Sequence, residues 1–579
     1  MNILMNENGD KIMFMIKEWL KNPKATNIPS VKYRNPDTAL RLQLSKKSIL
    51  QAKKEDEINL VQQYYLDNDI SRQNEIRQTL KKNVDNKNIN NIILLNERLY
   101  TELELGVKSE KIKQIIINKR LCMKDVFENI EKHNIKGYIV TSNSDIFFDE
   151  SLNNIKYARM LDEKKIFTLL RYEYKKEVDL KMCALYGEGV RADSQDTWIW
   201  HSNWKLHDKE LKLLNIEFGI PGCDNKLIYI FNILGFSCYN EPELIKSYHY
   251  HITEKRNYDN TKCIPTPYYG VFPLLKNEKE YNQESFDIIR ENENLFNYLT
   301  NKIKNNEVFI LPRIAGIENN IAMFGAMYKQ NGATSEQLLN IKRILPVMKN
   351  NAGILLTSNE SIAKYSELYL SAFHKCDRYF WWEPWGNVGS GISNSLQFVL
   401  LNFNKPKIDA VALDVFHSIK RNPWTLALKG KRLLIISPFK ESFEKKIKNR
   451  KLLYGIDLFP DCEFIFIKPP QTQGQNKSRE FDIELNKFIG EINKIKDSFD
   501  IALCSAGGYG NLICSALHGT GKSSIYIGGV LQMYFGVYGS RWLRERTDIM
   551  RLYLNKHWSR PESNEKPKGH NNVEGNCYW

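Results

Sequence analysis

The stretch GYIVTSNSDIFFD, residues 137–149, decides the fold of the first half of this chain. It opens with an apolar run over residues 138–140, typical of a buried strand, and a short polar segment then leads to Asp145 and Asp149. An α/β sheet presents acidic side chains in this way at the carboxyl ends of its strands, where such folds bind ligands. Oxygen ligands there suit Mg²⁺ or Mn²⁺, and such an ion would neutralise a diphosphate. A plain strand followed by an acidic turn fits the same residues.

Short apolar segments alternate with helical patterns on both sides of this stretch. Strands are expected over residues 58–65, 91–97, 113–117 and 166–170. Helices are expected over residues 71–86, 123–133 and 151–160. This alternation predicts repeated βα units and a mainly parallel sheet. Residues 1–55 are polar and rich in lysine, and their weak periodicity predicts a helical extension.

The second half of the chain is also expected to be α/β. Pro265 and Pro267 indicate a domain edge, so we expect one domain over residues 56–275 and another over residues 276–579. Strands are predicted over residues 308–311, 432–439, 463–467, 500–504 and 524–529. The fourth of these opens the glycine loop with Gly507, Gly508 and Gly510, followed by a helix. Such a loop lets backbone N–H groups and a helix N-terminus approach a phosphate, although the glycines also fit close helix–strand packing.

Composition and charge narrow the class of protein. At 579 residues the chain is too long for one ordinary core, and 42% hydrophobic residues with 12% aromatics indicate packed domains, not disorder. The net charge is +15, but the lysines are scattered, which indicates a solvated surface and no nucleic-acid function.

The cysteines and the apolar segments bear on where the protein is expected to reside. Ten cysteines without a C-x-x-C pair indicate reduced thiols. The sequence has no signal-peptide cleavage site and no apolar run of about 18 residues, so we expect a soluble, cytoplasmic protein with no transmembrane segment. A homo-oligomer is one possible assembly.

An ordered set of blocks between Ile58 and Tyr269 carries more information than any single motif. The blocks are QYY (63–65), LLNE (94–97), NSDIFFD (143–149), an arginine at a strand end (171), SQDTWI (194–199), PGCDN (221–225) and HYH (249–251). This order resembles a family of nucleotide-sugar glycosyltransferases of the GT-A type. The resemblance covers the first predicted α/β domain and implies a Rossmann-like fold that binds a nucleotide sugar.

The resemblance implies a metal and diphosphate site around Asp145. In the family's D-x-D type motif the first position is an acid, and here it is Asn143, whose carbonyl oxygen can still bind. His249 or His251 matches the position of a further metal ligand, and imidazole suits Mn²⁺ better than Mg²⁺. Taken alone, each histidine also fits a surface or core position.

The PGCDN block implies the catalytic base. Asp224 is the candidate that takes a proton from an acceptor hydroxyl, because a positioned carboxylate within hydrogen-bond reach can do so. The alternative is that Asp224 or Asn225 caps the apolar helix expected over residues 227–234.

The SQDTWI block and the arginine add candidates for substrate contacts. Asp193 and Asp196 could bind sugar or acceptor hydroxyls, with the faces of Trp198 and Trp200 alongside. A Trp-x-Trp alternation equally fits a half-buried strand. Arg171 could contact phosphate through its planar fork or pair with a neighbouring acid.

The second half resembles the GT-D type of glycosyltransferase domain. The shared blocks are SPF (437–439), AGGYG (506–510), GGVLQMYFG (528–536), RW (541–542) and the ending VEGNCYW (573–579). The GT-D pattern also has an Arg-x-Gly-Asp-Gly-Glu segment with an acid pair. Arg313 and Glu318 keep its spacing, but Gly316 stands at the aspartate position, so metal binding in this half is in question.

These observations predict an α/β protein of two Rossmann-like domains, GT-A-like and then GT-D-like, each a mainly parallel sheet flanked by helices. The expected activity is transfer of sugar from a nucleotide-sugar donor to a glycan or other hydroxyl acceptor, with Mn²⁺ or Mg²⁺ in the first domain and a second transfer step in the second. Inversion or retention is not decided. The rival hypotheses are a methyltransferase that uses residues 506–510 for S-adenosylmethionine, and a non-catalytic glycan-binding protein.

Overall fold

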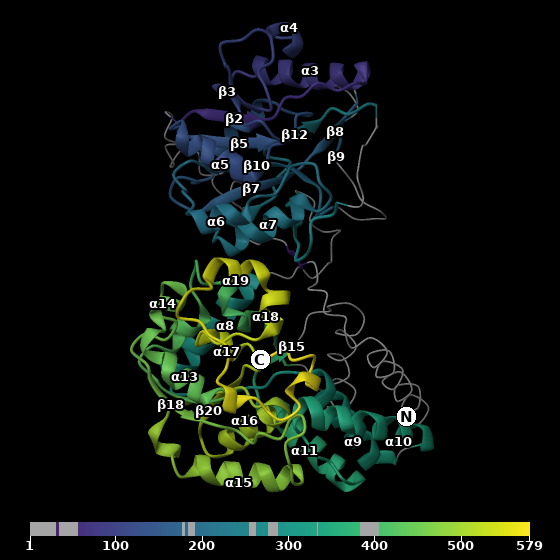
Figure 1. The fold of residues 1–579 in the computed structure, drawn as a ribbon, viewed down its shortest axis with the longest axis vertical. Coiled ribbons are helices and arrows are strands. Elements are labelled where there is room, and N and C mark those ends of the chain that lie inside the picture. Colours follow the sequence, from purple (N-terminus) through teal and green to yellow (C-terminus); the bar gives the residue numbers. More distant parts are fainter. Residues whose placement is uncertain are drawn as a thin grey trace. The chain divides into compact units, whose positions relative to one another are not determined.

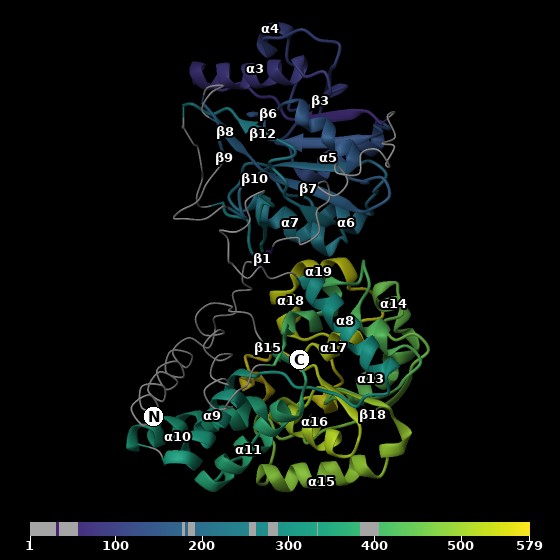
Figure 2. The same ribbon diagram turned by 180° about the vertical axis from the view of Figure 1, so that it is seen from behind.

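The protein divides into two compact units (Figure 1, and from behind in Figure 2). The computed structural model describes residues 31–33, 56–175, 180–182, 191–253, 262–275, 288–332, 334–381 and 405–579. The N-terminal unit lies within residues Ile28–Asp287, and Ile288 begins the main part of the C-terminal unit. The predicted helical extension lies outside the described residues except at β1 (Val31–Tyr33), which is a strand and not a helix. It pairs in parallel with β13 (Tyr269–Val271).

The N-terminal unit is built on a seven-stranded sheet in the order β11-β7-β10-β5-β2-β3-β4. Its strands are β2 (Ile58–Gln62), β3 (Asn91–Asn96), β4 (Ile112–Ile116), β5 (Tyr138–Ser142), β7 (Lys165–Leu170), β10 (Gln195–His201) and β11 (Ser237–Tyr239). All neighbours are parallel except β10, which runs antiparallel to both β5 and β7. The strands β4-β3-β2 have the order of one mononucleotide-binding half of a doubly wound fold, and β5 takes the place of the first strand of the second half. The carboxyl ends of β2 and β5 therefore meet at its switch point.

Helices surround this sheet and bury its apolar strands. They are α3 (Ile70–Asp85), α4 (Glu102–Leu105), α5 (Met123–Lys132), α6 (Asp208–Leu213), α7 (Cys223–Ile233) and a 3₁₀-helix where a longer helix was predicted (Glu150–Tyr157). Asp69 caps α3 by accepting hydrogen bonds from the backbone N–H groups of Ser71 and Arg72. Residues 138–142 are fully buried, as expected for a strand covered on both faces.

A small second sheet, in the order β6-β12-β8-β9, gathers the side chains of the candidate site. Its strands are β6 (Ile146–Phe148), β8 (Tyr172–Tyr174), β9 (Leu180–Met182) and β12 (Ser247–His249). The register sets His249 opposite Ile146 on one side and opposite Glu173 on the other. Because Asp145 directly precedes Ile146, this register brings three distant segments of the sequence together.

The C-terminal unit contains a five-stranded, fully parallel sheet in the order β14-β20-β19-β17-β18. Its strands are β14 (Ile310–Leu311), β17 (Arg432–Ile436), β18 (Glu463–Ile467), β19 (Ile501–Cys504) and β20 (Ser523–Tyr526). β18 follows β17 on one side and β19 lies on the other, so the strand order reverses between β17 and β19. In open α/β sheets, ligands bind outside the carboxyl ends of the strands at such a point.

Helices accompany this sheet as well. They are α8 (Ile288–Lys304), α9 (Gly316–Asn331), α10 (Ser335–Val347), α11 (Asn359–Lys375), α13 (Lys440–Lys446), α14 (Lys451–Tyr454), α15 (Phe481–Asn493), α16 (Gly510–Gly519), α17 (Leu531–Tyr534), α18 (Ser540–Glu545) and α19 (Thr547–Tyr553). A short parallel pair, β15 (Tyr379–Trp381) and β16 (Lys407–Asp409), lies outside the main sheet. The predicted fold class, α/β with mainly parallel sheets flanked by helices, is thus confirmed. In the part of the chain that the structure describes, no helix combines the length and hydropathy needed to cross a membrane.

Candidate functional site

The turn after β5 is held in place by the end of the neighbouring strand. The Gln62 side-chain amide donates hydrogen bonds to the Ser142 hydroxyl at 3.0 Å, to the Asn143 carbonyl at 2.8 Å and to the Ile146 carbonyl at 3.1 Å. The Tyr250 N–H donates to the Asp145 carbonyl at 2.9 Å. These bonds order the polar turn from both sides, so the Asp145 carboxyl lies buried beside β12.

Asp145 is surrounded by positive charge. Its Oδ2 accepts a hydrogen bond from Arg72 Nη2 at 2.5 Å and lies 3.2 Å from His249 Nε2. Burial by itself would raise the pKa of Asp145, but the charges and hydrogen bonds of His249 and Arg72 hold it well below its usual range. His249 also lies 2.7 Å from Glu173 through Nδ1. Burial lowers the pKa of His249, but Asp145 and Glu173 outweigh burial and raise it to about 9.

Asp145, His249 and His251 form a candidate metal centre. One ligand atom from each of them lies within 4.8 Å of the others. Asp145 Oδ1 and His251 Nε2 are buried and have no hydrogen-bond partner among the described residues. Burial, followed by the charges of Arg72 and His249, lowers the pKa of His251, which favours the neutral imidazole. An unpartnered carboxylate oxygen beside a neutral imidazole nitrogen is a donor set that fits Mn²⁺.

A chain of hydrogen bonds continues from Glu173 to the turn. Arg171, at the end of β7, donates from Nε to Glu173 at 2.9 Å. Its Nη1 donates to the Ser194 hydroxyl at 3.0 Å and also to the Asp196 carboxylate. The Asn143 amide donates to Asp196 Oδ1 at 2.7 Å. Arg171 therefore pairs with neighbouring acids, the second of the two roles expected for it. The side-chain amide of Asn143 orients Asp196.

Asp224 lies in the first turn of α7. It accepts hydrogen bonds from the backbone N–H groups of Gln195 at 3.3 Å and of Asn225 at 3.0 Å. Burial and the nearby charge of Asp196 raise its pKa to about 7, more than these two bonds lower it. The N-cap residue of α7 is Gly222 and neither Asp224 nor Asn225, although Asp224 still accepts a hydrogen bond from a backbone N–H of the first turn. A carboxyl group with this pKa can take up a proton at neutral pH.

The tryptophans of β10 belong to the core. Trp198 packs edge-on against Phe218 with ring centroids 5.3 Å apart, and Trp200 stacks on Phe127 at 4.6 Å. Both are buried, so neither offers a face to a sugar. Asp193 pairs with Arg191 at 3.2 Å. Of the two interpretations of this segment, the strand is the one observed, but it is buried along almost its whole length and not half-buried as expected.

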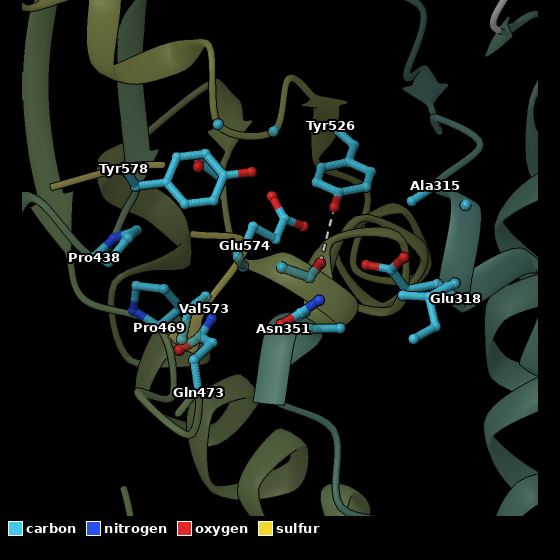
Figure 3. A pocket seen from close by; sticks show the side chains of 18 of the residues that line it. Ala315, Glu318, Asn351, Pro438, Pro469, Gln473, Tyr526, Val573, Glu574 and Tyr578 are labelled. Carbon is cyan, nitrogen blue, oxygen red and sulfur yellow. Dashed lines mark hydrogen bonds between the residues drawn. The ribbon is translucent and has the colours of Figure 1, made fainter. Parts of the chain in front are cut away.

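A separate cavity of about 300 Å³ opens in the C-terminal unit (Figure 3). It is lined by residues that follow each of the five parallel strands, by the start of α9 and by the end of the chain. The lining residues used below are Arg313, Gly316, Glu318, Gly507, Tyr526, Arg541, Glu574 and Tyr578. Phe439 after β17 and Ser505 after β19 also line it, so the cavity includes the switch point of the sheet.

The glycine loop contributes to this cavity through one of its three glycines. Gly507 lines it and has φ +51°, and its carbonyl accepts a hydrogen bond from the Tyr526 hydroxyl at 2.9 Å (dashed in Figure 3). A Cβ at Gly508 would lie 2.4 Å from Ile354 Cγ1, and one at Gly510 would lie 2.3 Å from the Tyr526 ring. Gly508 and Gly510 therefore allow close packing, and neither is among the lining residues.

Arg313 and Glu318 enter the same cavity. The Arg313 guanidinium lies 5.3 Å from the centre of the Tyr526 ring and donates to the Ile527 carbonyl at 3.4 Å. Glu318, in the first turn of α9, is only 8% exposed. Burial, strengthened by the charge of Glu574 and opposed by Arg313, raises the pKa of Glu318 to about 7. The structure thus keeps one acid of the expected pair in a buried position.

Sequence reasoning missed several residues of both sites. In the N-terminal unit these are Arg72 and Glu173, and in the C-terminal unit they are Arg541, Glu574 and Tyr578. The helical pattern around Arg72 and the closing VEGNCYW block are visible in the sequence, but neither indicates which distant residue its side chains meet. Only the fold places Arg72 against Asp145, and Glu574 in a cavity with Glu318.

Comparisons with known proteins give weak structural likenesses. No family model matches the chain, and no curated protein matches it. A glycosyltransferase of Streptococcus sanguinis (domain of unknown function 1792) is 12% identical, with 47% of this chain and 96% of that chain covered and a TM-score of 0.23. Another structure of that domain, described as having a distinct glycosyltransferase fold, is also 12% identical. It covers 49% of this chain and 98% of its own, with a TM-score of 0.24.

A further structure is similar over a larger part of this chain. It is a mannosyltransferase of Pyrobaculum calidifontis in complex with GDP-mannose and Mn²⁺, 8% identical, with 64% of this chain and 85% of that chain covered and a TM-score of 0.22. At TM-scores below 0.5 none of these likenesses decides the function, which has to follow from the chain's own residues.

Proposed function

We propose that the N-terminal unit is a metal-dependent glycosyltransferase that moves a sugar from a nucleotide-sugar donor to an acceptor hydroxyl. The observation that carries this proposal is the cluster of Asp145, His249 and His251, with two buried atoms that have no hydrogen-bond partner in the described structure. The cluster follows β5, beside the switch point of the sheet, where α/β folds bind ligands. A carboxyl group suited to proton uptake, Asp224, lies in the same unit.

The residues that would hold the metal are those three. Asp145 Oδ1 and His251 Nε2 have no hydrogen-bond partner to give up among the described residues. His249 would have to break its contact with Asp145 and lose a proton from its ring before it could bind the metal. A divalent ion bound there supplies positive charge that stabilises the departing nucleoside diphosphate. Arg72 already contacts Asp145 and is the cation best placed to pair with a donor phosphate through its planar fork.

Asp224 and Asp196 are the residues proposed to activate the acceptor hydroxyl. In an inverting reaction, the acceptor oxygen forms a bond to the anomeric carbon, the bond from that carbon to the donor phosphate breaks, and the hydroxyl proton passes to an Asp224 carboxylate oxygen. Asp196 is oriented by Arg171 and Asn143 and is a positioning residue, since its charge raises the pKa of Asp224.

The test is turnover of a panel of UDP- and GDP-sugars by the full chain with and without Mn²⁺. We expect Mn²⁺-dependent hydrolysis or transfer with at least one donor, and its loss in Asp145→Ala. Asp85→Asn, at the exposed end of α3, is the matched control and should keep full activity. A folded protein that turns over none of the donors would contradict the proposal and favour the glycan-binding alternative.

The C-terminal unit supports a second proposal, that the chain is bifunctional and adds a second sugar. Its cavity lies at the switch point of a parallel sheet and contains Gly507, Arg313 and Glu318, three residues expected to contact a donor. Calorimetry of the Asp145→Ala chain with UDP- and GDP-sugars, and separately with S-adenosylmethionine, tests it. Binding of a nucleotide sugar supports the proposal, whereas binding of the methyl donor alone would replace it with a methyltransferase.

A further inference from the structure

We propose that Glu318 and Glu574 together form a divalent-cation site in the C-terminal cavity. The GT-D pattern expects an acid at position 316, and this chain has glycine there. Gly316 and Glu574 line the same cavity, so the carboxylate absent from the start of α9 is replaced by one from the end of the chain. This inference concerns the C-terminal unit and does not depend on the site around Asp145.

Glu318 is a buried acid directed at this space. It is 8% exposed, it lines the cavity, and its carboxylate has no hydrogen bond or ion pair with another residue in the part of the chain that is described. A buried carboxylate is costly to leave without a partner, so such groups are normally paired or bind a metal. Figure 3 shows the carboxylates of Glu318 and Glu574 both pointing into the cavity.

Glu574 is held by contacts on its own side of the cavity. Arg541 Nη2 donates to Glu574 Oε2 at 2.6 Å, and Arg541 Nη1 donates to the Tyr578 hydroxyl at 3.3 Å. Glu574 has φ +45°, a left-handed conformation that a glutamate rarely adopts and that the surrounding contacts have to hold. Only Oε2 is used by Arg541, so the other carboxylate oxygen is left for a ligand.

The last residues of the chain are anchored where they line the cavity. The Trp579 carbonyl accepts hydrogen bonds from Arg560 Nη1 at 2.7 Å and from the Ser540 hydroxyl at 2.9 Å. A Cβ at Gly529 would lie 2.3 Å from the Tyr578 ring, and one at Gly539 would lie 2.4 Å from the Cys577 carbonyl. Glycine at these two positions therefore lets the closing segment, residues 573–579, pack closely. The backbone that carries Glu574 is held in place by this packing.

The charges of the cavity indicate what accompanies the cation. Two arginines, Arg313 and Arg541, balance the two glutamates among the lining residues. Arginine pairs with phosphate in a bidentate geometry, and carboxylate oxygens are ligands of Mg²⁺ and Mn²⁺. The arrangement therefore fits a divalent ion bound together with a diphosphate better than either alone.

The test counts bound Mn²⁺ on the full chain, using the electron paramagnetic resonance signal of free Mn²⁺ with and without UDP. The Asp145→Ala variant removes the proposed N-terminal site, so the Mn²⁺ that remains reports on the C-terminal one. We expect one Mn²⁺ to remain, bound more tightly with UDP. Adding Glu574→Gln should weaken it by about tenfold or more. Glu444→Gln, an exposed glutamate on α13, is the matched control and should leave the affinity unchanged.

A rescue variant separates loss of a ligand from loss of structure. Gly316 is the first residue of α9 and is not among the glycines with a left-handed φ, so its backbone suits aspartate, and an acid is favourable at a helix N-terminus. Gly316→Asp added to Glu574→Gln should restore most of the Mn²⁺ affinity. Unchanged affinity in Glu574→Gln, or no Mn²⁺ bound after Asp145→Ala, would overturn the inference. If instead Asp145→Ala leaves the number of bound Mn²⁺ ions unchanged, the N-terminal proposal fails while the C-terminal site stands.

Discussion

The two units contain acids in similar places but in opposite electrostatic settings. In the N-terminal unit, Asp145 contacts Arg72 and His249, so a negative charge is already compensated within the fold. In the C-terminal unit, Glu318 is buried beside a cavity and has no such partner among the described residues. The pKa of Asp145 is accordingly held low and that of Glu318 is raised to about 7. A buried acid in the segment that follows a strand therefore acquires its chemistry from its neighbours and not from its position in the fold.

The difference has a consequence for ligand binding. A cation held by Asp145, His249 and His251 together would have to replace the contact between His249 and Asp145, so binding there would be coupled to rearrangement of the His249 side chain. A cation that enters the C-terminal cavity meets Glu318 without displacing a partner. Four measurements test this contrast, from the largest expected effect to the smallest.

Removing the charge of Asp145 should have the largest effect. In Asp145→Asn the buried Arg72 keeps Glu75 as its one ion-pair partner among the described residues, which we expect to destabilise the N-terminal unit by about 3–5 kcal/mol. Urea denaturation followed by tryptophan fluorescence measures this loss, and the exposed Asp85→Asn variant should stay within about 0.5 kcal/mol of the parent chain. A loss below about 1 kcal/mol in Asp145→Asn would show that the network does not depend on this charge.

The next largest effect concerns Asp224. This carboxyl group of the N-terminal unit resembles Glu318, because burial raises its pKa too. Its pKa is raised to about 7, so it loses its proton as the pH rises through 7. We expect kcat/KM for sugar transfer to rise with pH and to be about tenfold lower at pH 6 than at pH 8. Asp224→Asn should lower kcat/KM by about 10²–10³-fold and remove this dependence. The same pH dependence in the variant would assign it to another group.

Neutralising Glu318 should change stability in the opposite direction from Asp145→Asn. Because burial raises the folded-state pKa of Glu318 from 4.5 to about 7, its ionisation destabilises the fold progressively as the pH rises through this range. We expect Glu318→Gln to stabilise the C-terminal unit by about 2–3 kcal/mol at pH 8 and by almost nothing at pH 4. Denaturation at both pH values measures this difference, and destabilisation at pH 8 would reveal a partner for the ionised carboxylate.

The smallest effect is expected in the glycine loop. A methyl group at Gly507 would lie 2.8 Å from the Ala352 carbonyl on a backbone with φ +51°, so Gly507→Ala should destabilise the unit by about 1 kcal/mol. Gly519→Ala is the control, because nothing lies within 4 Å of a Cβ there and its φ is not left-handed. Thermal denaturation of both variants measures the contrast, and equal melting temperatures would remove the steric argument for glycine at position 507.

The fold could be predicted from the sequence because it depends on local patterns. Apolar runs such as residues 91–96 and 501–504 have the length of buried strands and alternate with amphipathic segments, and both form strands. The pairing of distant strands left no such signal. Antiparallel insertion of β10 between β5 and β7 and the small sheet around β12 were not predicted, since they depend on contacts between residues far apart in the chain.

Local patterns were enough to predict the strand that ends in the turn of Asp145 and the glycine loop after β19. They also placed His249, His251, Arg313 and Glu318 in polar segments at strand or helix ends. The side chains that surround these groups follow from the packing of distant segments. Strand register set His249 between Asp145 and Glu173, and the closing segment brought Glu574 to the cavity that contains Glu318. The physical reason is that chain periodicity depends on neighbours a few residues apart, whereas the charge around a buried group depends on side chains that folding brings from anywhere in the sequence.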